Sequence, residues 1–423
     1  MKMTSATALS VASPPQTDTR TASLPTPKSS VHNVAFWLTA MAFLLNMGFS
    51  ALPTPLYVMY QQRDHLSNFM ITVIYAVYAV GVIGSLFLAG HLSDWIGRKA
   101  IFVPALLVNV LSAVIFIYEP STAGLLIARV ISGISVGLTT ATATSYLAEL
   151  HANARPSATK RRAEVVATAS NLGGIGVGPL AAGLLAEFAP APLRLPYLIF
   201  GALLVVLAVA LWFSPETVKR ADPFPRYRPQ RINVPESARK TFYAATAAGM
   251  AAFAVFGVFN SLAPSFLVGT LHQSSHVMAG VVAFAAFAAG AAAQILLSRS
   301  SSLSLLRQGV PTIVVGLALL TGGMWAGSLI MFLIGGIITG AAGGMVFKGA
   351  LVTAAATAPA GSRAEVLAGF FLGAYIGLSI PVVGLGIATM YAPARDVMLV
   401  FVVLAALAIA ASVRAVTNGV SAQ

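Results

Sequence analysis

Long apolar stretches alternate with short polar segments along most of the chain. A helix needs about 20 mostly apolar residues to cross the hydrocarbon core of a bilayer. Gly and Pro recur within several of the stretches, which membrane-spanning helices tolerate better than helices of soluble proteins do. The pattern predicts an all-α integral membrane protein with twelve spanning helices, at residues 34–60, 69–92, 100–118, 122–149, 164–189, 195–214, 241–270, 277–298, 309–326, 328–354, 364–391 and 396–416.

The composition excludes an ordinary soluble protein. Of the 423 residues, 57% are hydrophobic and 9% are charged, against roughly a quarter charged in a soluble domain. Cysteine is absent, which excludes disulfides and thiol chemistry. Residues 1–33 are rich in Ser, Thr, Pro and Ala, as expected of a disordered cytoplasmic tail. The first apolar stretch is too long for the core of a cleaved signal peptide.

Lys and Arg are distributed unevenly between the connecting segments. With the N-terminus placed in the cytoplasm, the external segments contain only Arg63, Arg194 and Arg395, while Arg129 and Lys348 fall inside helices. All the other Lys and Arg lie on the cytoplasmic side, as the positive-inside rule requires. We therefore predict a multi-pass protein of the inner (plasma) membrane with both termini in the cytoplasm. The net charge of +13 then reflects topology and attraction to anionic lipid headgroups, and we expect no nucleic-acid binding.

An internal similarity divides the chain into two halves. The segment from Arg162 to Ala167 resembles the segment from Arg363 to Ala368, 201 positions later, and both share Arg-Ala-Glu-Val at the expected start of a helix. Two halves with an even number of helices have the same orientation in the membrane, as in parallel-repeat transporters. We expect an N-terminal six-helix half at 34–214, a cytoplasmic linker at 215–240, a C-terminal half at 241–416 and a tail at 417–423.

A polar cluster lies between the second and third apolar stretches. It contains Gly90, Asp94, Gly97, Arg98 and Lys99 within ten residues. Glycine allows tight turns, and an aspartate can cap a helix or pair with a cation. The alternative is a basic turn that serves membrane topology alone.

This cluster resembles the loop between helices 2 and 3 of the major facilitator superfamily of secondary transporters. The resemblance implies two six-helix halves that rock about a central site, with this loop latching the halves together at the cytoplasmic face when the cavity faces outward. Asp94 is then expected to contact the start of helix 11 near Arg363 and Glu365. Arg98 is expected to pair with Glu149 at the inner end of helix 4.

Arg129 lies inside the fourth apolar stretch, four residues before Gly133. An intramembrane cation costs roughly 2.5–3.5 kcal/mol on insertion scales, so it usually faces a polar cavity. The spacing resembles the Arg-x-x-x-Gly pattern of helix 4 in the same family, which implies a role in proton transfer or substrate contact. The alternative is an arginine that extends to the headgroups.

Small residues and prolines recur in the fifth and eleventh stretches. Small residues let helices pack closely, and a proline inside a helix removes one hydrogen bond and permits a kink. The fifth stretch resembles the Gly-Pro motif of helix 5 in drug–proton antiporters, although its glycine after the proline comes later than in that motif. The resemblance favours export, and packing alone is the alternative. The positions are Gly174, Gly178, Pro179, Gly183, Gly377 and Pro381.

Lys348 is an unexpected residue within the tenth stretch. Lysine shifts its pKa readily when buried, so Lys348 is a candidate for binding an anionic substrate group or for carrying a proton. Extension toward the cytoplasmic headgroups is the alternative. Other polar candidates for the substrate or proton pathway are Asn46, Asn260, Gln294 and Tyr375.

These features together predict a secondary active transporter that works by alternating access, with proton-coupled efflux of small amphipathic or drug-like compounds, as in multidrug resistance. No acidic residue lies at a helix midpoint, so proton coupling would use Arg129, Lys348, Glu149 or a proton of the substrate. A uniporter or exchanger for a small organic anion is the alternative. A polytopic membrane enzyme is a remote one, because no catalytic constellation, metal-ligand spacing or phosphate-binding loop is present. We expect a monomer without cofactor or metal, whose partners are a small-molecule substrate, lipid and protons.

Overall fold

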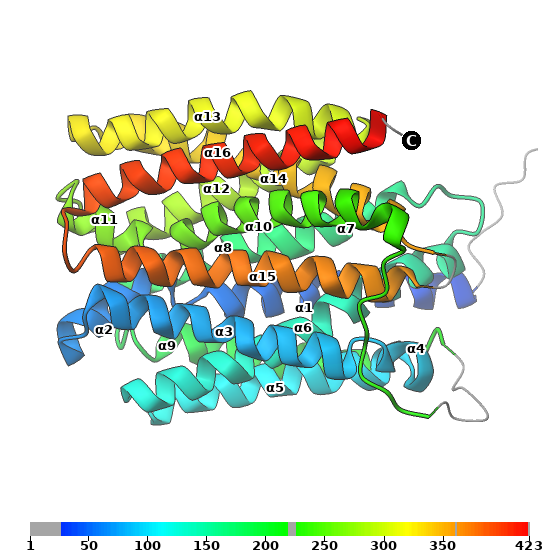
Figure 1. Ribbon diagram of the computed structural model, residues 1–423. Helices are drawn as coiled ribbons and strands as arrows, with labels where there is room; N and C mark the ends of the chain where they lie inside the picture. The colour runs from blue at the N-terminus through cyan, green and yellow to red at the C-terminus, as the bar shows by residue number, and fades with distance from the viewer. Residues whose placement is uncertain (1–26, 219–225, 360–361, 422–423) are drawn as a thin grey trace, which may run out of the picture.

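The computed structural model describes residues 27–218, 226–359 and 362–421. Every regular element in these ranges is helical, and twelve helices are long and apolar enough to cross a membrane. They lie side by side along one common direction (Figure 1). The predicted fold class, an all-α integral membrane protein with twelve spanning helices, is confirmed.

The long helices fall into two groups along the chain. The first group is α1 (Pro27–Ala51), α3 (Asn68–Ala89), α5 (Arg98–Tyr118), α6 (Thr122–Ala154), α8 (Gly174–Phe188) and α9 (Leu195–Trp212). The second group is α10 (Arg239–Ser261), α12 (His276–Leu296), α13 (Ser302–Ala326), α14 (Leu329–Ala356), α15 (Arg363–Ala388) and α16 (Ala394–Ser421). The short elements are η1 (Thr54–Leu56), α2 (Tyr57–Asp64), α4 (Leu92–Ile96), α7 (Arg161–Thr168), η2 (Ala169–Gly173), η3 (Glu236–Ala238) and α11 (Ala263–Gly269).

Several helices extend beyond the apolar stretches that predicted them. α1 begins at Pro27, so residues 27–33 are helical and not part of a disordered tail. α13 begins at Ser302, where the Ser301 hydroxyl accepts a hydrogen bond from the Ser304 N–H, and α16 continues to Ser421. Hydropathy marks the part of a helix that lies in lipid, whereas capping determines where the helix ends. Residues 1–26, 219–225 and 422–423, which belong to the expected tails and linker, lie outside the described residues.

Three of the spanning segments are interrupted. Pro53 follows α1, and the first span continues as η1 and α2. The fifth span contains a π-helical turn, η2, between α7 and α8, and the seventh breaks at Leu262 before α11. Proline cannot donate the hydrogen bond that a continuous helix needs, and π-helical turns often occur at functional positions. Each interrupted span touches the other half at or next to its break, since η1 and η2 contact α12 and α11 contacts α2.

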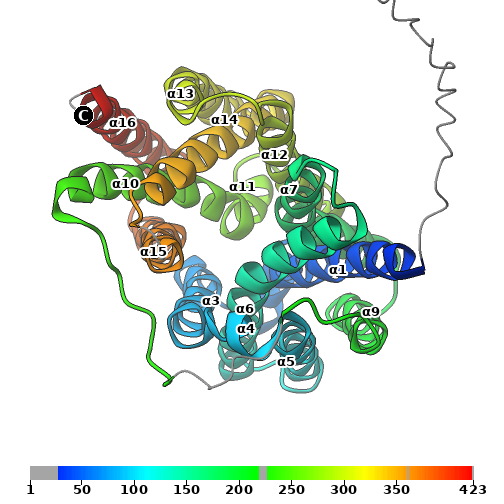
Figure 2. The ribbon, with the colours of Figure 1, turned by 90° about the vertical axis from the view of Figure 1, so that its right-hand side faces the viewer.

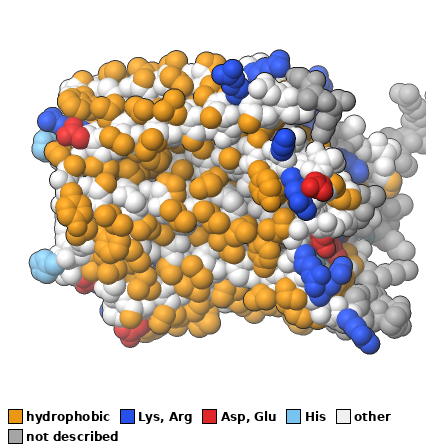
Figure 3. All heavy atoms as spheres, viewed as in Figure 1, with side chains coloured by type: hydrophobic (Ala, Val, Ile, Leu, Met, Phe, Trp, Pro, Cys, Tyr) orange, Lys and Arg blue, Asp and Glu red, His pale blue; other side chains and the backbone are white. Residues whose placement is uncertain are grey.

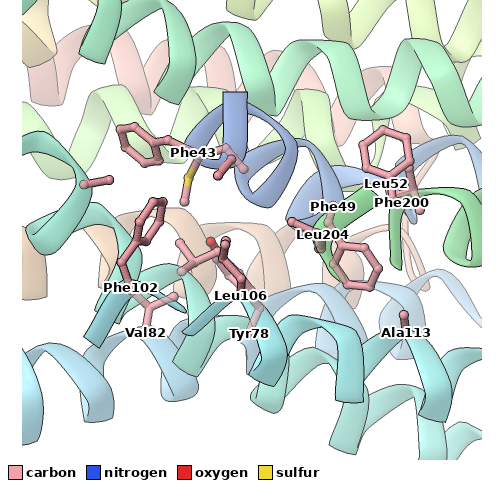
Figure 4. Close-up of a cluster of buried hydrophobic side chains, with 14 of the residues drawn as sticks. Phe43, Phe49, Leu52, Tyr78, Val82, Phe102, Leu106, Ala113, Phe200 and Leu204 are labelled. Carbon is pink, nitrogen blue, oxygen red and sulfur yellow. The ribbon is translucent and has the colours of Figure 1, made fainter. Parts of the chain in front are cut away.

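Each half has its own apolar core. Phe43, Phe49, Phe102, Leu106 and Phe200, which come from α1, α5 and α9, belong to the core of the first half (Figure 4). A second cluster joins α10, α12, α13, α14 and α16. Viewed along the helices, the two groups lie next to each other, with α3 beside α15 at one seam (Figure 2). At the other seam α8 packs against α12.

The surface distinguishes the two ends of the helix bundle from its sides. Hydrophobic side chains cover the side shown in Figure 3, and Lys and Arg side chains gather at one end. We call this the basic end; α1 and α5 begin there and α16 ends there (Figure 1). We call the other end, near α2 and α11, the opposite end. Large apolar side chains on the sides, such as Val206, Ile330 and Leu404, are exposed, as expected where lipid replaces water.

Glycine allows α3 and α6 to approach each other closely. A methyl group on Gly81 would collide with the Val130 carbonyl, and one on Gly133 would collide with the Tyr78 carbonyl. Small residues permit this kind of backbone contact between spanning helices. Gly84, one turn after Gly81 on α3, has no neighbour within 4 Å of an added methyl group.

This difference gives a test of the packing of the first half. We expect Gly81→Ala to lower the free energy of unfolding by about 1–3 kcal/mol, because the added methyl group separates two backbones. Gly84→Ala adds the same methyl group to the same helix in open space, and we expect it to be neutral or to stabilise by up to about 1 kcal/mol. Thermal unfolding of the purified variants in detergent measures both. Equal effects of the two substitutions would contradict this account.

Candidate functional site

A network of charged side chains surrounds Arg98 at the basic end. The Arg98 side chain is 9% exposed, and its guanidinium lies 2.8 Å from the Glu149 carboxylate and 2.6 Å from the Asp94 carboxylate. It also donates to the Ser93 hydroxyl at 2.9 Å, and the Thr217 hydroxyl donates to Glu149 at 2.6 Å. A planar guanidinium can bind several acceptors at once. The structure thus brings Arg98 and Glu149 together, as the sequence resemblance implies.

Glu216 completes this network, and the sequence analysis did not identify it. Its carboxylate accepts hydrogen bonds from the backbone N–H groups of Arg98 and Lys99 at 2.8 and 3.0 Å. These groups begin α5, where N–H groups lack partners within the helix and an anion is favoured. In the reverse direction, the Lys99 ammonium donates to the carbonyls of Trp212 and Ser214 at the end of α9. The two segments therefore cap each other's helix ends, far apart in the sequence.

The glycines of the cluster form the turns around it. Gly97 has a φ of 123°, a conformation that residues with a side chain rarely adopt. A methyl group on Gly97 would also collide with the Glu216 carboxylate. Gly90 follows α3 and donates to the Leu86 carbonyl at 3.1 Å. Gly97 is thus required both by the backbone and by the approach of Glu216.

The structure does not bring Asp94 to the start of α15. Its carboxylate pairs with Arg98 of its own half. Arg363 and Glu365 begin α15 and form no ion pair within the described residues. In this conformation the charged network therefore belongs to the first half and the segment that follows α9.

A strap of the linker, residues 226–232, connects the two halves at the basic end instead. The Tyr227 hydroxyl donates to the Leu88 carbonyl at 3.0 Å, and the Gln230 N–H donates to the Phe87 carbonyl at 2.8 Å. Ile232 lies over Gly369 of α15, where an added methyl group would come within 2.9 Å of it. The strap thus runs from the last turn of α3 to α15, as Figure 1 shows for the extended green segment.

Arg129 is buried inside α6 and does not reach the headgroups. It is 2% exposed, and it donates to the carbonyls of Ser50 and Tyr75 at 2.6 and 3.3 Å. Its guanidinium carbon lies 4.6 Å from the ring centre of Tyr78 and 5.6 Å from that of Tyr75. Carbonyl oxygens and aromatic faces stabilise a buried cation. The Nε atom has no partner among the described residues.

Aromatic rings next to Arg129 form a contact between the halves. Tyr78 of α3 and Tyr375 of α15 have ring centres 6.3 Å apart, and Tyr375 lies 5.7 Å from Phe253 of α10. Phe253 in turn stacks on Phe347 of α14 at 4.5 Å. We call these four residues the aromatic seam. The predicted pathway residue Tyr375 is thus placed close to Arg129, through Tyr78.

Asn46 lies away from this seam, inside the first half. It is fully buried; its amide donates to Thr139 at 3.0 Å and its oxygen accepts from Asn109 at 2.9 Å and from Ser135 at 3.2 Å. The network joins α1, α5 and α6 through both the nitrogen and the oxygen of the Asn46 amide, an arrangement that rigidifies a core.

Asn260 and its neighbours join the halves at the opposite end. The Thr54 hydroxyl donates to the Asn260 carbonyl at 3.0 Å, and the Ser265 hydroxyl donates to Gln61 at 3.2 Å. Further contacts at this end join α8 to α12, where Glu187 accepts from the His276 N–H at 2.8 Å. By contrast, α6 and α14 have no extended packing contact in the described part of the chain. The halves therefore meet along two seams, α3 with α15 and α7, η2 and α8 with α12, and through the hydrogen bonds at the opposite end and the strap at the basic end.

The small residues of the fifth and eleventh spans pack against neighbouring backbones. Methyl groups on Gly174 and Gly178 would collide with carbonyls of α1, and one on Gly183 would collide with the His276 carbonyl of α12. Pro179 of α8 lies against Gly280 of α12. On α15, Gly377 lies against the Met250 carbonyl, and Pro381 is within the helix. α8 therefore packs closely against both halves.

Lys348 and Gln294 come together near the basic end. The Lys348 ammonium donates to the backbone carbonyl of Gln294 at 2.6 Å. The Gln294 side chain is buried and its amide nitrogen has no hydrogen-bond partner among the described residues. The same ranges contain no group of three His, Asp or Glu side chains suited to a metal ion.

Comparisons with known proteins agree with this architecture. Residues 38–310 match the family model described as Major Facilitator Superfamily. An uncharacterised MFS-type transporter of Methanocaldococcus jannaschii is 26% identical over 182 residues, which make up 43% of this chain and 45% of that protein. The chain thus spans about half the length of this curated relative.

Two solved structures share the fold. A mutant of the nucleoside transporter NupG has a TM-score of 0.68 at 14% identity, covering 90% of this chain and 100% of that one. A bacterial homologue of the human lysosomal transporter Spinster, in an inward-facing and unoccupied conformation, has a TM-score of 0.66 at 16% identity, covering 92% and 98%. At these identities the likeness concerns the fold alone.

The capping role of Glu216 gives a second test. We expect Glu216→Ala to lower the free energy of unfolding by about 0.5–2 kcal/mol, the usual cost of removing a helix cap. Glu236→Ala serves as the control, because Glu236 lies in the exposed η3 turn without an ion pair among the described residues. Thermal unfolding in detergent should separate the two variants, and a loss of similar size in both would rule out the cap.

Proposed function

The chain belongs to the major facilitator superfamily, and on this basis we propose that it is a secondary transporter that works by alternating access. The distribution of contacts between the halves supports this proposal. The halves meet through Thr54 and Asn260 at the opposite end, while α6 and α14 lack extended packing. Rocking of one half against the other would separate the halves at the opposite end and bring α6 and α14 together. The aromatic seam would then become accessible from the opposite end. The family match also argues against the polytopic enzyme.

We propose that the basic end faces the cytoplasm of a cell whose plasma membrane holds the protein. The gathering of Lys and Arg at that end (Figure 3) supports this orientation. Both described chain ends, at Pro27 and Ser421, lie there as well.

We propose proton-coupled export of small amphipathic compounds as the activity. The aromatic seam offers apolar ring faces beside the buried charge of Arg129, a combination that suits a substrate with an apolar body and a polar group. The resemblance of the fifth span to drug–proton antiporters favours export. Lys348 is the candidate for the proton carrier, since it lies in a span and forms no ion pair within the described residues.

A carrier for a small organic anion is the second candidate. The observation that favours it is the pair of cations within the spans, Arg129 and Lys348. Neither is paired with an acidic side chain in the described residues. An uncompensated cation in a membrane interior favours the approach of an anion.

Cross-linking across the opposite end tests alternating access. The chain has no native cysteine, so the pair Thr54→Cys and Asn260→Cys can be joined selectively with a short bifunctional thiol reagent. We expect cross-linking to abolish transport in liposomes, because the halves cannot separate at that end. Cleavage of the cross-linking reagent should restore transport. The control pair is Ser304→Cys with Gln308→Cys, one turn apart on α13, which should transport equally with and without the reagent. Full transport by the cross-linked Thr54–Asn260 pair would contradict the proposal.

Liposomes with an internal pH dye distinguish the two candidate activities. Proton movement triggered by lipophilic cations would support export by antiport, whereas carboxylate flux without proton movement would support the anion carrier. In either case we expect Arg129→Lys to lower the rate about tenfold or more, because lysine keeps the charge but not the two-armed contact with Ser50 and Tyr75. Wild-type rates in this variant, with unchanged unfolding temperature, would exclude Arg129 from the pathway.

A further inference from the structure

Lys348 lies at the end of a regular contact between α12 and α14. Gly340 and Gly344 of α14 face the backbones of Ala286 and Gly290 of α12. One turn further along, the Lys348 ammonium bonds the carbonyl of Gln294. The lysine therefore takes the next position on the same helix face, where the small residues end and space for a longer side chain begins.

Several hydrogen-bond donors near this contact have no acceptor among the described residues. An ammonium has three N–H donors, and the Gln294 carbonyl accepts only one of those of Lys348. Gln294 is 8% exposed, and its amide nitrogen has no acceptor among the described residues. The Ser298 hydroxyl, one turn further along from Gln294, is also buried without a partner among the described residues. A buried donor without an acceptor destabilises the protein, so the structure leaves a place for an acceptor.

The described part of the protein supplies no anion to fill that place. Lys348 forms no ion pair there. The acid within its electrostatic range is Glu164 of α7, in the other half, and Glu164 is itself exposed. Figure 2 shows α7 beside α12 at the basic end, where the two helices are in contact. The donors thus lie near the seam between the halves, across from a carboxylate that does not reach them.

We propose that Lys348 and Gln294 form the subsite that binds the carboxylate group of an amphipathic substrate. A carboxylate has only acceptors and a single negative charge, which matches one ammonium and one amide N–H₂. Phe347, the residue before Lys348 on α14, belongs to the aromatic seam and faces α10, so the ring faces and the ammonium lie at one level of the helix on two adjoining sides. The inference rests on the proposed transport function; of the two candidate activities it favours the carrier for an organic anion, and it assigns Lys348 to the substrate and not to a proton.

The test compares carboxylates with their uncharged counterparts. Benzoate, 1-naphthoate and octanoate, each beside its primary amide, are titrated into the purified protein in detergent while its unfolding temperature is followed. We expect the acids, and not the amides, to stabilise the wild-type protein. Lys348→Gln and Gln294→Leu should each weaken the response to the acids at least tenfold, whereas Lys348→Arg should retain part of it. The absence of any difference between acids and amides, or an undiminished response in Lys348→Gln, would overturn the inference.

Two further variants test whether the response to acids is specific to the Lys348 subsite. Lys240→Gln removes an exposed cation at the start of α10 and should leave the acid response unchanged; a loss there as large as in Lys348→Gln would mean general charge attraction and would overturn the subsite. Glu164→Gln should leave the acid response unchanged or strengthen it. A complete loss of the acid response in that variant would also overturn the inference, since it would make the Glu164 carboxylate a required part of the site.

Transport measured separately distinguishes this inference from the function on which it rests. Flux of neutral amphipathic compounds in liposomes, together with equal binding of acids and amides, would keep the transporter and refute the subsite. Selective binding of carboxylates with no flux of any compound in liposomes would support the subsite and refute the proposed transport.

Discussion

A bilayer provides no water to satisfy the polar groups of the backbone, and this constraint determines most of what the structure shows. Every span must satisfy its N–H and C=O groups internally, so each is a helix. Where a span departs from a regular helix, as at η1, η2 and Leu262, it is covered by neighbouring helices. The hydrophobic effect does not drive helices together in lipid. Close van der Waals contacts between helices, such as Gly81 with Val130, stabilise their packing instead. Cations inside the spans obey the same constraint, because Arg129 and Lys348 both use backbone carbonyls as acceptors.

The charged groups consequently divide into two kinds. At the basic end Arg98 is surrounded by the carboxylates of Asp94 and Glu149, and Glu216 holds the helix that Arg98 begins. These charges neutralise one another and fix the structure of one half. Within the spans, Arg129 and Lys348 lack acidic partners among the described residues, and each has N–H donors without an acceptor there. The first kind of group stabilises the fold, and the second remains available to a solute.

The sequence predicted the spans well because hydropathy and length carry that information locally. It also indicated the pairing of Arg98 with Glu149, through a family resemblance. It could not identify Glu216, since a lone glutamate after an apolar stretch gives no sign that it caps a helix more than a hundred residues earlier. The helix extensions to Pro27 and Ser421 were missed because polar residues continue a helix without raising hydropathy. Lys348 and Gln294 were each noted as candidates, but their meeting depends on which faces of α12 and α14 are in contact, and periodicity alone does not determine that.

The strap between α3 and α15 sets a limit on how far the basic end can widen. Gln230 is bonded to the Phe87 carbonyl, and Ile232 lies over Gly369 only two residues later. Two residues of extended chain span roughly 7 Å, so while both anchors hold, these helices stay within a short tether of each other. Opening would then pivot about this edge, with the widest displacement at the other seam, between α8 and α12. Any larger separation of α3 and α15 must first detach the strap. The segment between the halves therefore limits their motion as well as connecting them.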